Sequence, residues 1–408
     1  MFARNRADTL VCPYGSPPSK MKFTSAWTWA VLAVALLLAG CASARANAAT
    51  SAPPTGTPTV ALPLPTATRT ASPSPSPTDS PPSIPTHTPT PIPDTVILFT
   101  GDINPGRCVY AYAKAANDMA LPYRGLAEIL QSADITVGSL DGTFSDYNPP
   151  PPCDEHHRNL LAPAEAAQGL AFAGFDVMTV ATNHAKDCGI VRGCKDQSLL
   201  DTLDNLRAVG VAPVGGGKNL AEAVAPVILT VNGTRFAFLG FSAVNNTIWA
   251  SEAAPGTAPF LPEVYAAAIE QARAHAEVVI VLPQWGREFT PRINWPQYQG
   301  AQALVAAGPT LVIGNNPHHV QGVQTFDNGA VAAYALGNFV FDQQWTDGTE
   351  YTVQGLMLKA TFHGAELQGV ELIPIHIYDN FQPRLAPPEE AAHILQVVEE
   401  SLALGPGN

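Results

Sequence analysis

Residues 96–107 read VILFTGDINPGR, where a β-branched and aromatic run gives way abruptly to glycine, aspartate and proline. The run predicts a short buried strand over residues 96–100, and the glycine after it predicts a turn that carries Asp102 at the end of the strand. The same pattern of an apolar run followed by a polar residue recurs along the chain. It predicts strands over residues 135–140, 177–181, 227–231, 235–241, 278–282, 310–313, 330–335, 353–362 and 366–374.

Helical patterns separate these runs. They cover residues 125–132, 164–174, 197–209, 263–275 and 298–307. Strands that alternate with helices predict an α/β domain. Because the last strands follow one another without a helix between them, we expect the second half of the domain to be largely antiparallel.

Composition divides the 408 residues into one folded domain and a long non-globular leader. Residues 42–94 hold 14 of the 39 prolines, mixed with Ser, Thr and Ala, and have few large apolar side chains to bury. Such a segment cannot offset the entropy of ordering, so we expect a disordered linker. The domain is then expected over residues 95–380, with a C-terminal helix and tail over 381–408.

The 34 Asp and Glu residues outnumber the 21 Lys and Arg residues, and the basic residues do not cluster. A surface that binds nucleic acid needs clustered cations to replace the counterions of phosphate. The charge pattern therefore excludes nucleic acid as an expected partner.

An apolar segment precedes the linker. Residues 27–40 read WTWAVLAVALLLAG and are followed directly by Cys41. The run is short for a membrane-spanning helix, although a plain membrane anchor is the alternative. The Leu-Ala-Gly-Cys sequence resembles a bacterial lipobox, so residues 1–41 are expected to be a signal peptide with Cys41 lipidated, and translation can start at Met21. This predicts a protein anchored to the extracytoplasmic face of the bacterial membrane.

Export would place the remaining cysteines in an oxidising compartment. Cys108, Cys153, Cys188 and Cys194 form an even set, which favours two disulfides. We expect Cys188 to pair with Cys194 across a short loop, and Cys108 therefore with Cys153. A zinc site is the rival interpretation, but the close spacing typical of zinc ligands is missing.

Polar side chains follow the predicted strands at five separate places: Asp102, Asp141, Asn183-His184, Gln284 and His318. In α/β folds the carboxyl ends of the strands are where ligands bind. Carboxylate, amide and imidazole groups that meet there suit one or two divalent metals, with Mn²⁺, Mg²⁺, Fe²⁺ or Zn²⁺ as candidates. Taken singly, each residue has a local structural explanation, such as capping a turn.

Six motifs in order resemble the CapA-type capsule-synthesis family, which belongs to the metallophosphoesterase-like (calcineurin-like) superfamily. They are GDINPGR at 101–107, SLD at 139–141, DVMTVATNHAKDCG at 176–189, QWGRE at 284–288, GNNPHHVQ at 314–321 and ALGNFVFD at 335–342. The resemblance covers residues 96–374. It implies a four-layer α/β/β/α sandwich and an association with poly-γ-glutamate capsule production.

The resemblance also implies roles for individual residues. Asp102 would bind one metal, Asp141 would bridge two, and Asn183 would bind the second. The wider candidate set is His184, Asp187 and Glu288 as catalytic residues, with Gln284, Asn316 and His318 as further metal ligands. Within it, Asp187 would orient His184. Arg107 would bind an anionic substrate group.

The sequence departs from the family motifs at two expected ligands. Gln284 stands where the family has histidine in His-Trp-Gly-x-Glu, and Asn316 replaces one of two paired histidines. Amide oxygens suit Mg²⁺, Ca²⁺ or Mn²⁺ but compete poorly with imidazole for Zn²⁺. The two departures therefore lower the expected affinity for zinc and put the two-metal chemistry in doubt.

Three functions are compatible with these residues. The first is a metal-dependent hydrolase or transferase in capsule or poly-γ-glutamate synthesis, export or processing, which would act on an anionic envelope polymer and meet other capsule-synthesis membrane proteins. The second is a non-catalytic polymer-binding protein with a degenerate metal site. The third is a divalent-metal phosphoesterase, suggested by superfamily analogy alone.

Overall fold

The computed structural model describes residues 93–407 except 155, 191–192, 195 and 344–349, and these belong to one compact unit. The predicted signal peptide, Cys41 and the linker up to residue 92 lie outside the described residues. Within the described part of the chain, none of the helices is long and apolar enough to cross a membrane.

The first sheet has eight strands in the order β18-β17-β16-β1-β2-β5-β6, and β15 pairs with the end of β1. Its strands are β1 (Asp94–Ile103), β2 (Ile135–Leu140), β5 (Val177–Thr179), β6 (Ala212–Val214), β15 (Asn338–Val340), β16 (Gln354–His363), β17 (Glu366–Tyr378) and β18 (Gln382–Leu385). The strands β1, β2, β5 and β6 are parallel, so their carboxyl ends meet at one edge.

The second sheet has six strands in the order β13-β14-β12-β11-β9-β8. They are β8 (Val227–Val231), β9 (Thr234–Ser242), β11 (Val278–Gln284), β12 (Leu311–Ile313), β13 (Val323–Thr325) and β14 (Val331–Ala333). The central pairs β9–β11, β11–β12 and β12–β14 are parallel, and only the two edge pairs are antiparallel. The expectation of a largely antiparallel second half is wrong for this sheet, because the helices between β9, β11 and β12 are crossovers that return the chain in the same direction.

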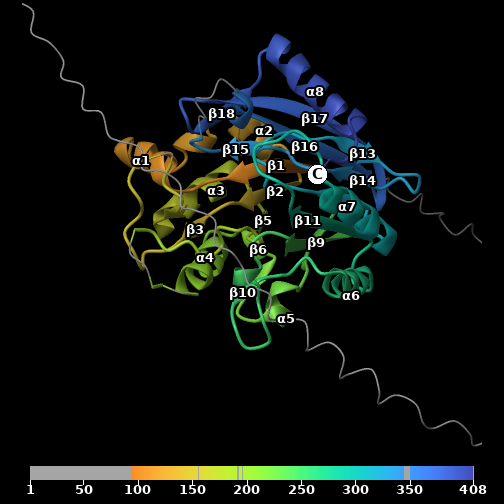
Figure 1. Cartoon of the computed structure of the whole chain (residues 1–408), viewed down its shortest axis with the longest axis horizontal. Helices are drawn as coiled ribbons and strands as arrows, with labels where there is room; N and C mark the ends of the chain where they lie inside the picture. The colour runs from red at the N-terminus through yellow and green to blue at the C-terminus, as the bar shows by residue number, and fades with distance from the viewer. Residues whose placement is uncertain (1–92, 155, 191–192, 195, 344–349, 408) are drawn as a thin grey trace, which may run out of the picture. The chain divides into compact units, whose positions relative to one another are not determined.

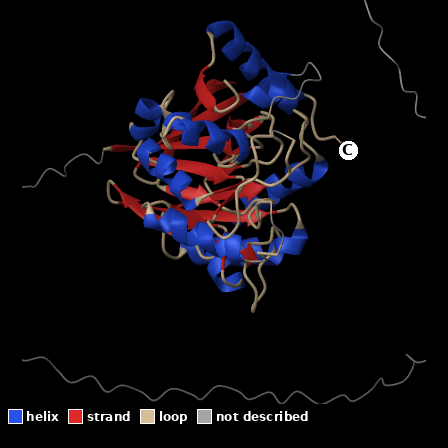
Figure 2. Cartoon of the chain, turned by 90° about the vertical axis from the view of Figure 1, so that its left-hand side faces the viewer, coloured by secondary structure: helices blue, strands red, loops and turns tan. Residues whose placement is uncertain are grey.

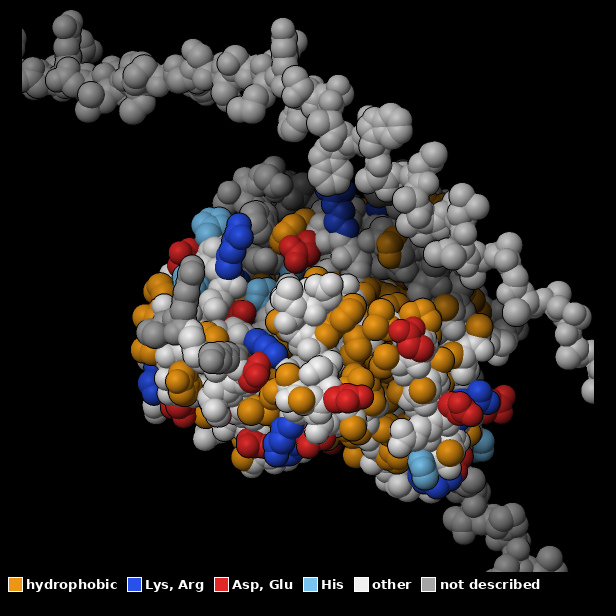
Figure 3. Space-filling view, turned by 60° about the horizontal axis from the view of Figure 1, so that its bottom comes forward, with side chains coloured by type: hydrophobic (Ala, Val, Ile, Leu, Met, Phe, Trp, Pro, Cys, Tyr) orange, Lys and Arg blue, Asp and Glu red, His pale blue; other side chains and the backbone are white. Residues whose placement is uncertain are grey.

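Helices cover the outer faces of the two sheets (Figures 1 and 2). They are α1 (Arg107–Ala115), α2 (Ala127–Gln131), α3 (Gln168–Ala173), α4 (Gln197–Ala208), α5 (Leu220–Ala223), α6 (Pro262–Arg273) and α7 (Trp295–Ala307). The last helix, α8 (Pro388–Ala403), instead packs against the core between the sheets. On the face drawn in Figure 3, acidic and basic side chains are interspersed around an apolar stretch.

Alternating side chains of each strand build separate cores. In β1, Leu98 packs toward α1 to α4, whereas Ile97 and Phe99 join Phe236 and Phe238 of β9 in a core shared by both sheets. The opposite face of β9 packs against α6 and α7. This alternation is what a strand buried on both faces requires. The predicted four-layer α/β/β/α sandwich is confirmed.

The end of the chain belongs to the same unit. Strand β18 pairs with β17, and Ile394 and Val398 of α8 are buried in the core shared by the sheets. Ser401 of α8 donates a hydrogen bond to the carbonyl of Pro291 and accepts one from the amide of Gly322. The folded unit therefore continues beyond residue 380.

Two disulfides join Cys108 to Cys153 and Cys188 to Cys194. This is the pairing expected from the sequence, and it leaves these four sulfurs unable to bind zinc as thiolates. The first bond ties the start of α1 to the long loop between β3 (Thr143–Phe144) and β4 (Leu161–Ala162).

Candidate functional site

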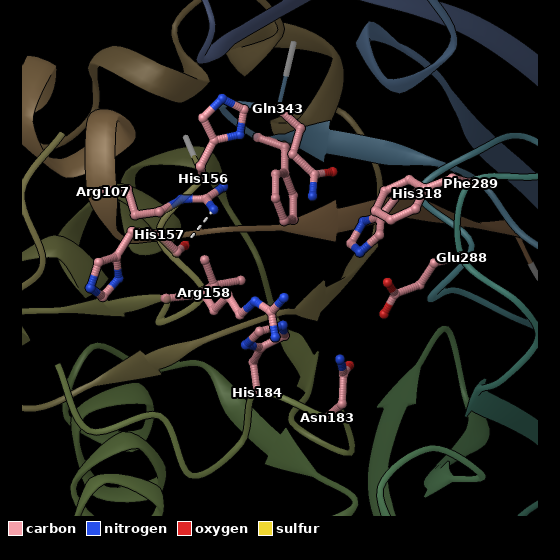
Figure 4. Close-up of a pocket in the computed structure, with 12 residues that line it drawn as sticks. Arg107, His156, His157, Arg158, Asn183, His184, Glu288, Phe289, His318 and Gln343 are labelled. Atoms are coloured by element: carbon pink, nitrogen blue, oxygen red, sulfur yellow. Dashed lines mark hydrogen bonds between the residues drawn. The ribbon is translucent and has the colours of Figure 1, made fainter. Parts of the chain in front are cut away.

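A cavity of about 630 Å³ opens where strands of both sheets end (Figure 4). Parallel pairing brings the carboxyl ends of β1, β2 and β5 to this edge, and β11 and β12 of the second sheet end beside them. The lining residues are Arg107, His156, His157, Arg158, Leu160, Asn183, His184, Glu288, Phe289, His318, Phe341 and Gln343. Of the strand-end residues that the sequence singled out, Asn183, His184 and His318 line the cavity, and Asp102 and Asp141 lie beside His318. Gln284 lines a separate, smaller cavity.

Asp102 is fully buried at the end of β1. One carboxylate oxygen accepts a hydrogen bond from the Ser139 hydroxyl at 2.8 Å, and the other accepts one from the backbone amide of Asn316 at 3.1 Å. Burial and the nearby charge of Asp141 raise the pKa of Asp102 to about 7. Burial and the second carboxylate therefore favour the neutral form of Asp102, although His318 beside it acts in the opposite direction.

Asp141 follows β2 and is also fully buried. Neither of its carboxylate oxygens has a hydrogen-bond partner within the described structure. An unpaired buried carboxylate is costly, so this position favours a bound cation.

Three amide side chains have unpaired oxygens at the same edge. They are the Oδ1 atoms of Asn183 and Asn316 and the Oε1 atom of Gln284, all buried. The Nδ2 of Asn316 donates to the Gly286 carbonyl at 2.9 Å, which fixes the amide plane and leaves its oxygen unpaired. Asn316 also has a φ of +101°, a strained conformation for a residue with a side chain.

His318 lies beside both aspartates. Its Nδ1 lies 2.8 Å from Oδ1 of Asn338, which as an amide oxygen must accept, so in the neutral ring Nε2 has the lone pair. That Nε2 is 4.0 Å from Asp141 Oδ2, a separation that two ligands at about 2.1 Å from one cation can span. The His318 ring is held between Phe289, which stacks on it, and Phe341, which meets it edge-on.

His184 and Asp187 form the hydrogen-bonded pair expected from the sequence. The Nδ1 of His184 lies 2.7 Å from Oδ2 of Asp187, and that carboxylate also accepts from the amide of Leu160. Burial alone would lower the pKa of His184, but the charges of Asp187 and Asp141, with Glu288 adding to them, raise it to about 9. Asp187 thus orients the ring so that Nε2 is left for the cavity, where Glu288 also lies.

Arg107 is held by the protein itself. Its guanidinium forms a buried ion pair with Asp342 through Nε and Nη2, and Nη1 donates to the carbonyl of His157 at 2.8 Å. Asp342 also accepts from Asn104 Nδ2 at 2.8 Å and from the amide of Cys108 at 3.0 Å. Although Arg107 lines the cavity, its charge is already neutralised by Asp342.

The donor set fits a hard divalent cation. Two buried aspartates lie beside one imidazole, and three amide side chains at neighbouring strand ends have oxygens without partners. Oxygen ligands of this kind suit Mg²⁺, Mn²⁺ or Ca²⁺ better than Zn²⁺. Among the described residues, no group of three or more His, Cys, Asp or Glu side chains is arranged to hold a metal. Any metal here therefore depends on the amides.

Several residues of the site had no role assigned from the sequence. Ser139 positions Asp102, Asn338 positions His318 and Asp342 anchors Arg107. Asn338 and Asp342 both lie in the ALGNFVFD motif, so that motif could have identified them as residues of the site. Arg158, which lines the cavity from the β3–β4 loop, had no such signal.

Solved structures of low sequence identity have a similar arrangement. A putative 5'-nucleotidase from Staphylococcus aureus is 12% identical, with a TM-score of 0.45 over 76% of this chain and 58% of that chain. A 5'-nucleotidase precursor from Thermus thermophilus is 12% identical, with a TM-score of 0.42 over 76% of this chain and 59% of that chain. Because both TM-scores are below 0.5, the fold assignment rests on the sheet order described above.

Relatives of known family are more similar. The PGA biosynthesis protein CapA of Bacillus subtilis (strain 168) is 30% identical over 283 residues, which are 69% of this chain and 71% of that protein. The capsule biosynthesis protein CapA of Bacillus anthracis is 34% identical over 193 residues, which are 46% of this chain and 45% of that protein. The model of the family described as bacterial capsule synthesis protein PGA_cap matches residues 96–343. The chain belongs to this family of CapA-type capsule and PGA biosynthesis proteins.

Proposed function

We propose that this protein is an exported CapA-like lipoprotein that processes or transfers an anionic envelope polymer such as poly-γ-glutamate at a divalent-metal site. Lipidation of Cys41 would anchor it to the extracytoplasmic face of the membrane, near other capsule-synthesis membrane proteins, with residues 42–94 as a tether. The family supports the capsule role, and the chemistry of the site supports the reaction class.

One observation carries the proposal. Buried oxygens of Asp141, Asn183, Gln284 and Asn316 have no partners at the strand ends where His318 and Asp102 also lie, although the Nε2 donor of Gln284 is unpaired as well. Buried polar groups in folded proteins are normally paired, so a cluster of unpaired acceptors is best explained by a cation that they share.

The residues around this cluster divide the work of a hydrolase or transferase. His184, held by Asp187, presents Nε2 to the cavity as a general acid or base. Its raised pKa keeps the ring protonated at neutral pH in the metal-free protein, and a neighbouring cation would lower that pKa by repulsion. A divalent cation, when bound, would polarise a substrate oxygen. Ser139 and Asn338 hold Asp102 and His318 in place.

The test is the metal content of the purified full chain. We expect the wild-type protein to bind Mn²⁺ or Mg²⁺ and the Asp141→Asn variant to lose that metal. The Gln284→His/Asn316→His variant should gain affinity for Zn²⁺, because imidazole replaces amide. Gln368→His adds a histidine on an exposed part of β17 and serves as the control. Metal-free wild-type protein that still binds the polymer would refute a metal-dependent reaction.

A second candidate function is non-catalytic polymer binding at a degenerate site. It is favoured by the amides at Gln284 and Asn316 and by the lack of a His, Cys, Asp and Glu cluster within the described residues. It predicts that restoring both histidines changes metal content but not polymer affinity. Turnover of the polymer by wild-type protein, abolished in His184→Ala, would exclude it.

A further inference from the structure

Two cavities meet at the loop after β11. The first is the cavity of about 630 Å³ described above, and the second, of about 710 Å³, is lined by Val244, Gly286, Arg287, Glu288, Phe289, Thr290 and Asn316. Glu288 and Phe289 line both. The reaction centre is therefore open on two sides of these residues, which we call the Glu288–Phe289 ridge.

The ridge is held in place by the site. The amide of Phe289 donates to the carbonyl of Pro317 at 2.8 Å, and its ring stacks on His318 with centroids 5.5 Å apart. Phe289 has a φ of +59° and is 45% exposed, an arrangement that costs both strain and apolar exposure. Backbone strain of this kind is typical of functional positions. Here it holds the Phe289 ring as a fixed aromatic wall between the two cavities.

Each cavity also has one arginine that no described residue neutralises. Arg158 lines the first and Arg287 lines the second, and neither forms a hydrogen bond or ion pair with another described residue. In Figure 4 the Arg158 side chain extends into the cavity from the same wall as Arg107. In contrast to Arg107, both guanidinium groups retain donors for an anionic ligand.

The backbone on either side of Arg158 is anchored. The carbonyl of His157 accepts from Arg107, and the amide of Leu160 donates to Asp187 at 2.6 Å. The disulfide from Cys108 to Cys153 ties the same loop to α1. A cation on a fixed backbone loses less entropy when it binds a ligand, so Arg158 is placed to bind rather than merely to be solvated.

We infer that the site is a continuous groove for an extended polyanion, in which Arg158 and Arg287 each bind a carboxylate on opposite sides of the Glu288–Phe289 ridge. The polymer identity rests on the proposed function. Glu288 repels a carboxylate at the ridge itself, so the negative groups of the chain settle to either side and the linking bond crosses the reaction centre. An interior bond is thereby selected over a chain end.

The test uses the full chain and γ-linked glutamate oligomers of increasing length, with inorganic phosphate as a second probe. We expect Arg158→Ala and Arg287→Ala each to weaken binding of long oligomers about two- to fivefold, the effect of losing one exposed ion pair. The double variant should lose about the product of the two. Monomeric glutamate, which has no linking bond to place across the ridge, should lose affinity in at most one single variant. Phosphate, a single small anion, should bind equally in Arg287→Ala and wild type.

Arg207→Ala is the matched control, because it removes one exposed arginine on α4 outside both cavities. Long-oligomer binding that is reduced equally by all three alanine variants would overturn the inference and leave only a general charge effect. Equal affinity for monomeric glutamate and long oligomers would also overturn it. If the wild-type protein binds oligomers of no length, the proposed function fails and this inference fails with it. Unchanged metal content in both variants excludes an indirect effect through the metal site.

Discussion

Replacing Arg107 by methionine tests whether this residue belongs to the scaffold or to the substrate site. Arg107 is 3% exposed and Asp342 is 0% exposed, so the substitution leaves a buried carboxylate without its counter-ion. Asp342 would keep only the neutral donors of Asn104 and Cys108. Removing one partner of a buried pair costs about 3–5 kcal/mol, a large part of the roughly 5–15 kcal/mol that stabilises a typical domain.

The assay is urea unfolding under non-reducing conditions, with the free energy of unfolding extrapolated to water. Lys359→Met is the control, because it breaks a pair with Glu371 whose side chains are 39% and 61% exposed. Exposed pairs contribute about 0–1 kcal/mol, so the control should lose no more than that. Arg107→Lys should restore part of the loss, since lysine keeps the charge but not the paired geometry.

If Arg107 has a structural role, the same variant should also show a second effect. The bond from Arg107 to the carbonyl of His157 disappears, so the loop that carries Arg158 loses one of its anchors. Oligomer binding should weaken together with stability. A variant that unfolds like wild type yet binds the polymer poorly would refute the reasoning. It would indicate that Arg107 binds the substrate and does not stabilise the fold.

Three further predictions follow from local geometry. A Cβ at Gly101 would lie 2.0 Å from the backbone oxygen just before β15, so Gly101→Ala should cost about 1–3 kcal/mol or prevent folding, as seen in urea unfolding. In metal-free protein the pKa of His184 is raised from 6.5 to about 9, so its contribution to stability is complete below about pH 6.5 and disappears as pH rises to about 9; Asp187→Asn should flatten that slope in unfolding measured at several pH values. The bond between Cys108 and Cys153 closes a loop of 45 residues, so replacing both by serine should cost about 4 kcal/mol on the chain-entropy model, measured by thermal unfolding.

The strands were predictable because their signal is local. The run over residues 96–100 lies within β1, and Phe236 and Phe238 of β9 alternate as a doubly buried strand demands. The direction in which strands pair depends on contacts between distant segments and has no local signal. The parallel centre of the second sheet was therefore not predicted. Helix α1 was missed for a similar reason: its N-cap, Gly106, makes no side-chain hydrogen bond, so the usual polar start signal is absent.

The site divides in the same way. Asp102, Asp141 and His318 were predictable because each follows an apolar run, and strand ends meet at one edge of a sheet. The residues that hold these side chains in place, such as Ser139 and Asn338, were not predictable, because each acts through a contact between distant segments. Asn104 and Asp342 are 238 residues apart when they share a hydrogen bond, a contact that no spacing rule in one sequence specifies.

If the proposed metal site is correct, the amides at Gln284 and Asn316 would determine which cation it uses. Two buried carboxylates side by side need either a proton or a cation between them, and burial together with the charge of Asp141 raises the pKa of Asp102 in favour of the proton. A cation must displace that proton, so binding strengthens as pH rises. Imidazoles in place of the amides would favour Zn²⁺, whereas amide oxygens favour Mg²⁺, Mn²⁺ or Ca²⁺. A cation bound at the proposed site would therefore be a hard one, and the two substitutions would alter the choice of metal while the buried carboxylates remain.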